Sequence, residues 1–154
     1  HGSSKLDSAI LWDFLVSLLH TASMRLLPRR AISFGLVGAS GVLVQLITTS
    51  LLMGLFALRF QQALPIAVLT AASSNYLVNN ALTFRDRRQS GRQLIQGLLK
   101  FLLVASLPAL ANIGLASGFY ALIQEHAVLA QLAGIVVVYI WNYAASSRFV
   151  WNTP

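Results

Sequence analysis

The chain has 154 residues, of which 56% are hydrophobic and only 10% are charged, and its net charge is +7. Soluble domains carry about 25% charged residues, so this composition excludes an ordinary soluble globule and indicates an integral membrane protein. The basic residues cluster at the ends of apolar runs instead of covering one solvated face, which argues against a nucleic-acid-binding protein.

The first predicted element is an amphipathic helix over residues 6–27. Apolar residues recur there at helical spacing, with Asp7, Asp13, Ser17 and His20 between them. Such a stripe is typical of a helix that lies in the membrane interface and does not cross the bilayer. The alternative is a helix whose apolar stripe packs on a partner domain.

Four long apolar runs follow, at about residues 31–58, 63–84, 94–123 and 127–150. Each is near or above the length of about 20 residues that crosses a bilayer core. The sequence therefore predicts an all-α membrane protein with four transmembrane helices between residues 31 and 154. In this arrangement all 11 Lys and Arg residues except Arg59 fall on one side of the membrane. The positive-inside rule makes that side, and both chain termini, cytoplasmic.

The chain also contains an internal repeat. An offset of 67 residues aligns two Asn-Tyr pairs, one glutamine with an asparagine, and aromatic residues at both ends of the repeat. Each unit contains two predicted spans, so both units enter the membrane from the same side. This pattern predicts two parallel two-helix repeats related by an axis along the membrane normal. The aligned pairs are Phe34 with Phe101, Gln45 with Asn112, Asn75-Tyr76 with Asn142-Tyr143, and Phe84 with Trp151.

Several amides interrupt the apolar runs. Asn75 lies ten residues before Arg85, which places it about 15 Å from that end of its helix and near the middle of the bilayer. Polar side chains at this depth usually face a protein interior or a wet cavity. One hypothesis is a polar groove. The alternative is that each amide joins two helices, at about 0.6 kcal/mol per bond. The groove candidates are Gln45, Asn75, Asn79, Asn80, Asn112 and Asn142.

Arginines stand at the predicted cytoplasmic ends of the spans. Arg85 and Arg148 border the last turns of the second and fourth spans. A guanidinium there can reach a lipid phosphate with paired donors. The alternative role is to set the topology and to bind anionic headgroups in general. The arginines that we expect to bind phosphate are Arg29, Arg30, Arg85, Arg88 and Arg148.

Small residues in the spans predict close helix packing. Glycines at such positions let two helix backbones approach each other. The packing candidates are Gly35, Gly38 and Gly41 in the first span and Gly114 and Gly118 in the third.

Catalytic constellations are missing from the sequence. The only acids are Asp7, Asp13, Asp86 and Glu125, and the chain has no cysteine. There is no acid pair for general acid–base work, no cluster of metal ligands and no phosphate-binding glycine loop. No carboxylate lies within a span to relay protons. We therefore expect no cofactor in this chain, and its status as an enzyme stays open.

Three segments carry a resemblance to a known family. "FGLVGASGVLVQ", "SNYLVNNALTFRDR" and "WNYAASSRFVW" resemble the GtrA-like four-span membrane proteins, over about residues 30–152. The resemblance implies either movement of polyprenyl-phosphate sugars across the membrane or support of the glycosyltransferase that makes them.

The amino end carries a second resemblance. "HGSSKLDS" resembles the "GESKLD"-type segment that closes the catalytic domain of family-2 polyprenyl-phosphate sugar synthases of the dolichol-phosphate mannose synthase kind, with Ser3 in place of the usual Glu. There the segment leads into an interfacial helix beside the lipid phosphate, so the resemblance adds Lys5 to the phosphate-binding residues. It also implies two parts: residues 1–30 as the end of a catalytic-domain linker with a juxtamembrane helix, and residues 31–154 as a GtrA-like four-span domain.

The two resemblances together imply the membrane domain of a polyprenyl-phosphate glycosyltransferase, in a bacterial or archaeal cytoplasmic membrane. Its expected partners are polyprenyl phosphate or its sugar, membrane lipids, a family-2 glycosyltransferase domain in cis or in trans, and further copies of the chain in a homo-oligomer. A divalent metal is expected only in a fused catalytic domain. The alternatives are a structural anchor or oligomerisation module of the synthase and a small-solute transporter. The last of these lacks a charged site within the membrane.

Overall fold

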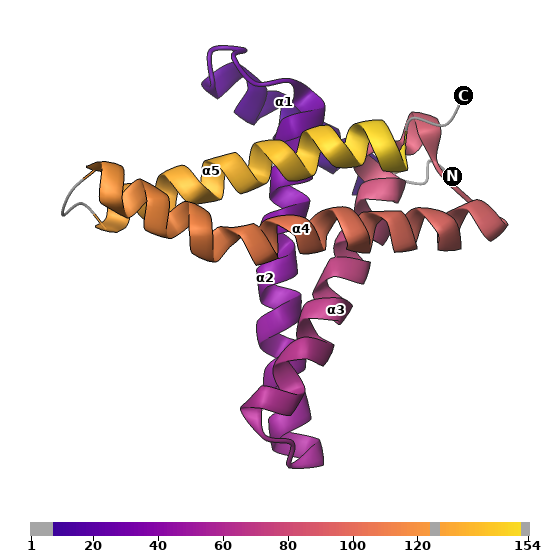
Figure 1. Ribbon diagram of the computed structural model, residues 1–154. Coiled ribbons are helices and arrows are strands. Elements are labelled where there is room, and N and C mark those ends of the chain that lie inside the picture. The colour runs from indigo at the N-terminus through magenta and orange to yellow at the C-terminus, as the bar shows by residue number, and fades with distance from the viewer. Residues whose placement is uncertain (1–7, 124–126, 152–154) are drawn as a thin grey trace. The chain divides into compact units, whose positions relative to one another are not determined.

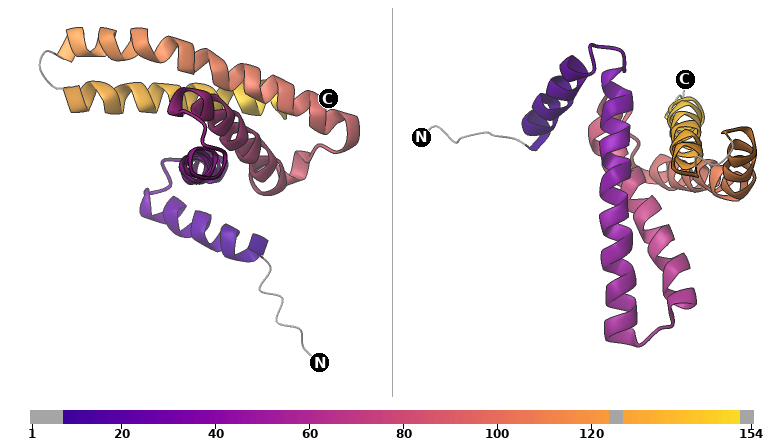
Figure 2. Two further views of the ribbon diagram at one scale, coloured as in Figure 1. Left: turned by 90° about the horizontal axis from the view of Figure 1, so that it is seen from below. Right: turned by 90° about the vertical axis from the view of Figure 1, so that its left-hand side faces the viewer.

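The computed structural model describes residues 8–123 and 127–151, and it describes no side chains between residues 108 and 135. Every regular element over these residues is a helix. The chain divides into two compact units, residues 1–88 and residues 89–154. Each unit is a helical hairpin, and unit 1 carries one further helix at its amino end (Figures 1 and 2).

Unit 1 begins with α1 (Ser8–Ala22), which a turn connects to the long helix α2 (Arg29–Phe56). Met24 and Arg25 both have positive φ in this turn. Pro28 ends it at the N-cap of α2, where the missing N–H of proline costs no helical hydrogen bond. Residues 8–22 of the predicted amphipathic segment are therefore helical, and residues 23–27 lie in the turn.

A tight turn at Ala57 reverses the chain after α2. Ala57 adopts the left-handed conformation, with φ of 52°, and its N–H bonds to the carbonyl of Leu52. The next helix, α3 (Phe60–Val78), starts with a capping box between Arg59 and Gln62. The two helices then run antiparallel and side by side (Figure 2).

Small residues dominate the buried side of α3. Ala63, Ala67 and Ala71 recur every four residues and are at most 5% exposed. Side chains this small let the backbone of α3 approach α2 closely. Large apolar residues elsewhere on α2, among them Leu46 and Leu55, are more than half exposed, as expected for a surface that faces lipid.

One helix, α2, is long and apolar enough to cross a membrane, by length and composition, within the described part of the chain. The shorter α1 is also apolar. α3 contains two glutamines near its start and the polar stretch Ser73–Asn75 near its end, and these lower its hydropathy. The all-helical fold is confirmed, whereas the arrangement of four spans stays a prediction.

Unit 2 consists of α4 (Gly91–Ile123) and α5 (Ala127–Ala145), which also form a hairpin. The side-chain amide of Gln89, just before α4, donates a hydrogen bond to the carbonyl of Val150 at the other end of the hairpin. This bond joins the beginning of the unit to its end.

Both hairpins end in the same local structure. α3 continues into the π-helical turn η1 (Asn79–Thr83), and α5 continues into the π-helical turn η3 (Ser146–Val150). The wider turns are closed by Phe84, whose N–H bonds to the carbonyl of Asn79 at 2.8 Å, and by Trp151, whose N–H bonds to that of Ser146 at 3.3 Å. The two turns lie 67 residues apart, the offset at which the sequence repeats.

Each π turn leads to a buried aromatic pair. In unit 1 the rings of Phe34 and Phe84 lie 6.4 Å apart at 78°. In unit 2 the rings of Phe101 and Trp151 lie 5.9 Å apart at 67°. Edge-to-face pairs of this kind stabilise the folded state by about 0.5–1.5 kcal/mol, in addition to the stabilisation that comes from burying the rings. The pairs match at the same offset, so the two units close their hairpins in the same way.

Candidate functional site

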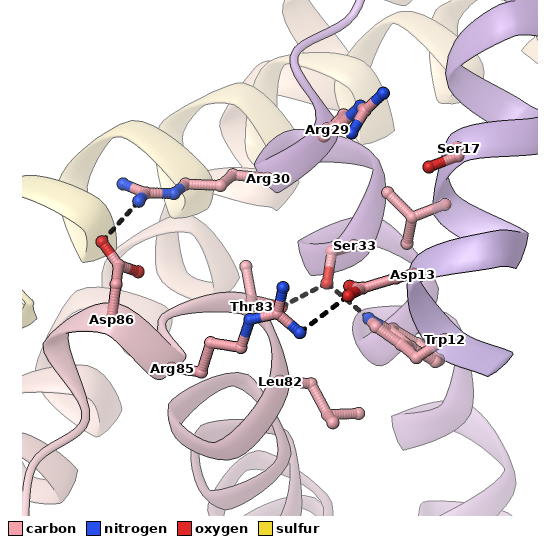
Figure 3. A pocket seen from close by; sticks show the side chains of 11 residues that line it. Trp12, Asp13, Ser17, Arg29, Arg30, Ser33, Leu82, Thr83, Arg85 and Asp86 are labelled. Atoms are coloured by element: carbon pink, nitrogen blue, oxygen red, sulfur yellow. Dashed lines mark hydrogen bonds and ion pairs between the residues drawn. The ribbon is translucent and has the colours of Figure 1, made fainter. Parts of the chain in front are cut away.

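Unit 1 contains a pocket of about 350 Å³ between α1, the start of α2 and the end of the hairpin (Figure 3). The short 3-10 turn η2 (Arg85–Arg87) forms one of its sides. Charged and hydroxyl-bearing side chains dominate the lining. The lining residues are Trp12, Asp13, Val16, Ser17, Arg29, Arg30, Ser33, Leu82, Thr83, Arg85 and Asp86.

Arg85 reaches the pocket because the helix ends just before it. Phe84 leaves the helical conformation, with φ of −113° and ψ of 33°, and its ring is buried. The chain then turns into η2, and Nη1 of Arg85 lies 2.8 Å from Oδ2 of Asp13 on α1. Both side chains of this ion pair are about half exposed.

A second ion pair lies on the other side of the pocket. Nη2 of Arg30 lies 2.5 Å from Oδ2 of Asp86, and Nε of Arg87 lies 3.9 Å from the same oxygen. Arg29 lines the pocket as well, and it forms no hydrogen bond or ion pair with a residue that the structure describes. Three guanidinium groups and two carboxylates line the pocket, which leaves one net positive charge.

A chain of hydrogen bonds joins the three elements around the pocket. Nε1 of Trp12 donates to Oγ of Ser33 at 2.9 Å, and this hydroxyl lies 2.6 Å from Oγ1 of Thr83. Ser33 and Thr83 are both buried. The chain therefore connects α1 to α2 and α2 to η1. The sequence had not singled out Trp12, Ser33 or Thr83, because 50 residues separate the two hydroxyls.

The arginines predicted to bind phosphate are distributed over the two units. Arg29, Arg30 and Arg85 line the pocket. Arg88 is exposed at the end of unit 1 and is not among the lining residues, and Arg148 is exposed on η3 in unit 2. Lys5 lies outside the described residues. The structure thus brings three of the six predicted residues together.

Asn75 on α3 lies directly against Gly41 on α2. A Cβ atom at position 41 would be 2.4 Å from Oδ1 and 2.5 Å from Nδ2 of Asn75. The glycine therefore provides the space that the amide occupies. At Gly38, one turn earlier, a Cβ atom would have no neighbour within 4 Å.

Four buried oxygens accept no hydrogen bond from the residues that the structure describes, and they occur at matching places in the two units. They are Oδ1 of Asn75 and Asn79 in unit 1, and Oδ1 of Asn142 and Oγ of Ser146 in unit 2. Members of each pair are four residues apart, and the pairs are 67 residues apart. Asn79 and Ser146 are each 1% exposed. Almost all buried polar groups in proteins have partners, so two identical exceptions indicate a shared role. Ser146 is an addition to the residues that the sequence singled out.

The remaining predicted residues are less informative. Asn80 is buried and has a partner, while Gln45 and Gly35 are half-buried on α2. Neither of the two pockets described for unit 1 is lined by the amides. Asn112, Gly114 and Gly118 lie on α4, and their side chains are outside the described part of the structure.

The described residues contain no group of three or more His, Cys, Asp or Glu side chains that could hold a metal ion. Donors thus dominate the pocket of unit 1, whereas the four buried oxygens in the hairpins are three amide acceptors and the hydroxyl of Ser146, which can both donate and accept. The first arrangement suits an anion. The second suits the hydroxyl groups of water or of a polyol.

Comparison with known proteins agrees with the helical architecture. The family described as "GtrA/DPMS, transmembrane domain" matches residues 33–151, which include both π turns and both hairpins except residues 29–32 at the start of α2. Helix α1, Arg29 and Arg30 precede the matched region. No curated protein shows significant similarity to the chain.

Proposed function

Because the chain belongs to the GtrA/DPMS transmembrane-domain family, we propose that it is the membrane domain of a polyprenyl-phosphate glycosyltransferase system. It acts in the synthesis or the transbilayer movement of a polyprenyl-phosphate-linked sugar. The protein then lies in the cytoplasmic membrane of a bacterium or archaeon, with both termini on the cytoplasmic side.

The pocket of unit 1 is the observation that carries this proposal. Arg29, Arg30 and Arg85 all line this pocket. Guanidinium groups bind phosphate oxygens through paired, charge-assisted hydrogen bonds. The exposed apolar surface of α2, which includes Val42, Leu43, Leu46 and Ile47, suits the isoprenoid tail.

The family membership and the matched hairpins support four membrane spans arranged as two parallel repeats. Each hairpin ends in a π turn followed by a buried aromatic residue. Basic residues before α2 and α4 would keep these ends on the cytoplasmic side. In this arrangement the arginine pocket lies at the level of the lipid phosphates.

In the translocation version of the function, the buried acceptors receive the sugar. Asn75 and Asn79, with Asn142 and Ser146 in the second unit, offer oxygens without donors. An ionised phosphate offers only hydrogen-bond acceptors, so it binds the arginines. The hydroxyl groups of a sugar can instead donate hydrogen bonds to the buried side-chain oxygens. The arginines therefore suit the phosphate of a glycosyl phosphate, and the buried oxygens suit its sugar.

The anchor version is the second candidate, and α1 favours it. Trp12 fixes α1 to the start of α2, and Asp13 fixes it to η2 at the end of the hairpin. A catalytic domain connected to the amino end of α1 would be held at a set place beside the lipid phosphate. In this version the spans only position the enzyme and its lipid.

Binding of polyprenyl phosphate to the chain in phosphatidylcholine nanodiscs tests the proposal. Replacing Arg85 with Gln is expected to weaken binding about tenfold, because it removes a charge-assisted contact. The matched control is Arg92→Gln, which removes an exposed arginine outside the pocket and leaves the affinity unchanged. Equal affinities for the two variants would contradict the phosphate site.

A further inference from the structure

Helix α1 contacts the pocket with two neighbouring side chains of different chemistry. The indole of Trp12 donates to the buried hydroxyl of Ser33 at 2.9 Å. The carboxylate of Asp13 pairs with Arg85 at 2.8 Å, and 50% of its side chain is exposed. Since water screens such an exposed pair, it shifts an equilibrium by about fivefold at most. The ion pair is therefore the contact of α1 that an anion can break most easily.

We propose that the Asp13 carboxylate occupies the place on Arg85 that the phosphate of the lipid ligand takes, so that α1 is a latch that the phosphate opens. The inference rests on the proposed function and adds a mode of regulation to the same pocket. A bound phosphate displaces Asp13 and meets Arg85 and the neighbouring Arg29. Helix α1 then keeps only uncharged contacts, among them the hydrogen bond of Trp12 and the packing of the buried Val16.

The ionisation of the ligand decides how well the latch opens. A phosphate monoester carries about 1.5 to 2 negative charges at pH 7, whereas a glycosylated phosphate is a diester with a single charge. Exchange of Asp13 for a diester merely replaces one monoanion with another. A monoester brings additional charge, which Arg29 can meet with its own donors. The free carrier lipid therefore opens the latch more readily than the glycosylated lipid, because Arg29 meets its additional charge, whereas Asp13 competes equally with both ligands.

The sequence confines the latch to unit 1. At the offset of 67, the positions that correspond to Arg29 and Arg30 hold Gln96 and Gly97, and the position that corresponds to Thr83 holds Val150. Ser33 corresponds to Lys100 and Arg85 to Asn152. The repeat thus retains its π turns and its buried acceptors, while the arginines and hydroxyls that engage α1 occur once per chain.

Binding measurements on the full chain in phosphatidylcholine nanodiscs test the latch. The ligands are a polyprenyl phosphate and its glucosyl diester at pH 7. Wild type is expected to bind the monoester more tightly than the diester. Asp13→Asn removes the competing charge, so both ligands are expected to bind about two- to fivefold more tightly. The ratio of their affinities stays the same, because both displace the same carboxylate.

The position of α1 provides the second measurement. The chain has no cysteine, so two introduced cysteines can be spin-labelled selectively. Suitable exposed positions are Ala22→Cys in α1 and Ala39→Cys in α2, and the two labels report one distance distribution. Polyprenyl phosphate is expected to change this distribution in wild type, and Asp13→Asn to change it without ligand. Asp86→Asn is the matched control. It removes an equal charge from the pocket but makes no contact with α1, so it leaves the distribution unchanged.

The outcomes separate the latch from the site itself. If Arg85→Gln weakens binding but Asp13→Asn and Asp13→Ala do not tighten it, Asp13 only holds the helix and the latch is wrong. If Arg85→Gln binds like wild type, the proposed function fails first. The last comparison uses nanodiscs that contain phosphatidylglycerol, an anionic lipid whose headgroup phosphate is a diester. A shift of α1 there as large as with polyprenyl phosphate would show that any anionic headgroup opens the latch, and would overturn the preference for a monoester.

Discussion

Gly41 on α2 and Asn75 on α3 form a complementary pair, in which the missing side chain of the glycine makes room for the amide. A Cβ atom at position 41 would lie within 2.8 Å of three atoms of the Asn75 side chain. The amide thus lies in the α2–α3 interface, and the packing of the hairpin depends on the residue at position 41.

Replacing Gly41 with Ala is therefore expected to destabilise the protein by about 1–3 kcal/mol, as overpacking of a buried contact does. The measurement is thermal or chemical unfolding of the purified protein in detergent. Gly38→Ala is the matched control, because a Cβ atom there meets nothing within 4 Å. In the double variant with Asn75→Ala, most of the loss should disappear, since the clashing amide is gone. Equal stabilities for Gly41→Ala and Gly38→Ala would contradict this contact.

The two buried serines at the hairpin ends allow a second comparison. Ser33 has two hydrogen-bonding neighbours, whereas Oγ of Ser146 has no partner among the described residues. Ser33→Ala should cost about 1–2 kcal/mol, because Trp12 and Thr83 lose their partner. Ser146→Ala removes an unsatisfied hydroxyl and should be neutral or slightly stabilising. A loss at Ser146 equal to that at Ser33 would show that this hydroxyl has a donor in the membrane.

The asparagines of the repeat distinguish a sugar path from an anchor. If Asn75 and Asn142 receive sugar hydroxyls, replacing either with Leu removes a hydrogen bond of about 1 kcal/mol and slows transport several-fold. The measurement is movement of polyprenyl-phosphate sugar in proteoliposomes, with synthesis by the transferase measured in parallel. Folded Asn→Leu variants that translocate at the wild-type rate would rule out the path. The anchor version would then take its place.

Topology tests the membrane arrangement as a whole. A reporter fused after Pro154 should be cytoplasmic, and a reporter inserted at Gln61, at the start of α3, should be external. The reason is that all 11 Lys and Arg residues except Arg59 lie on one predicted side. The reverse result would place the arginine pocket on the outer face, where a cytoplasmic synthase could not supply its ligand.

Elements formed by consecutive residues were largely predictable. The amphipathic pattern over residues 6–27 predicted a helix, and α1 covers most of it. The third apolar run, predicted at residues 94–123, corresponds to α4 (Gly91–Ile123). The offset of 67 found in the sequence recurs in the π turns and the aromatic pairs. Periodicity and run length are local properties, so the order of residues is enough to reveal them.

The site depended on contacts between distant residues, and the sequence could not indicate them. Asp13 and Arg85 are 72 residues apart, and nothing in the amphipathic pattern of α1 selects Asp13 as the partner of that arginine. Gly41 was predicted to pack helices, but its neighbour Asn75 could be named only from the structure.

By itself the sequence determined the membrane class, the approximate positions of the helices and the offset of the repeat, because each follows from the spacing of apolar, polar and charged residues along the chain. Only the tertiary structure decided which side chains meet. The π turn Asn79–Thr83 shows the reason. One extra residue in a helical turn rotates every following side chain by about 100° around the axis, and the letters "NNALT" do not reveal that insertion. The positions of Thr83 beside Ser33 and of Arg85 beside Asp13 depend on this rotation and on how α1 folds back against α2.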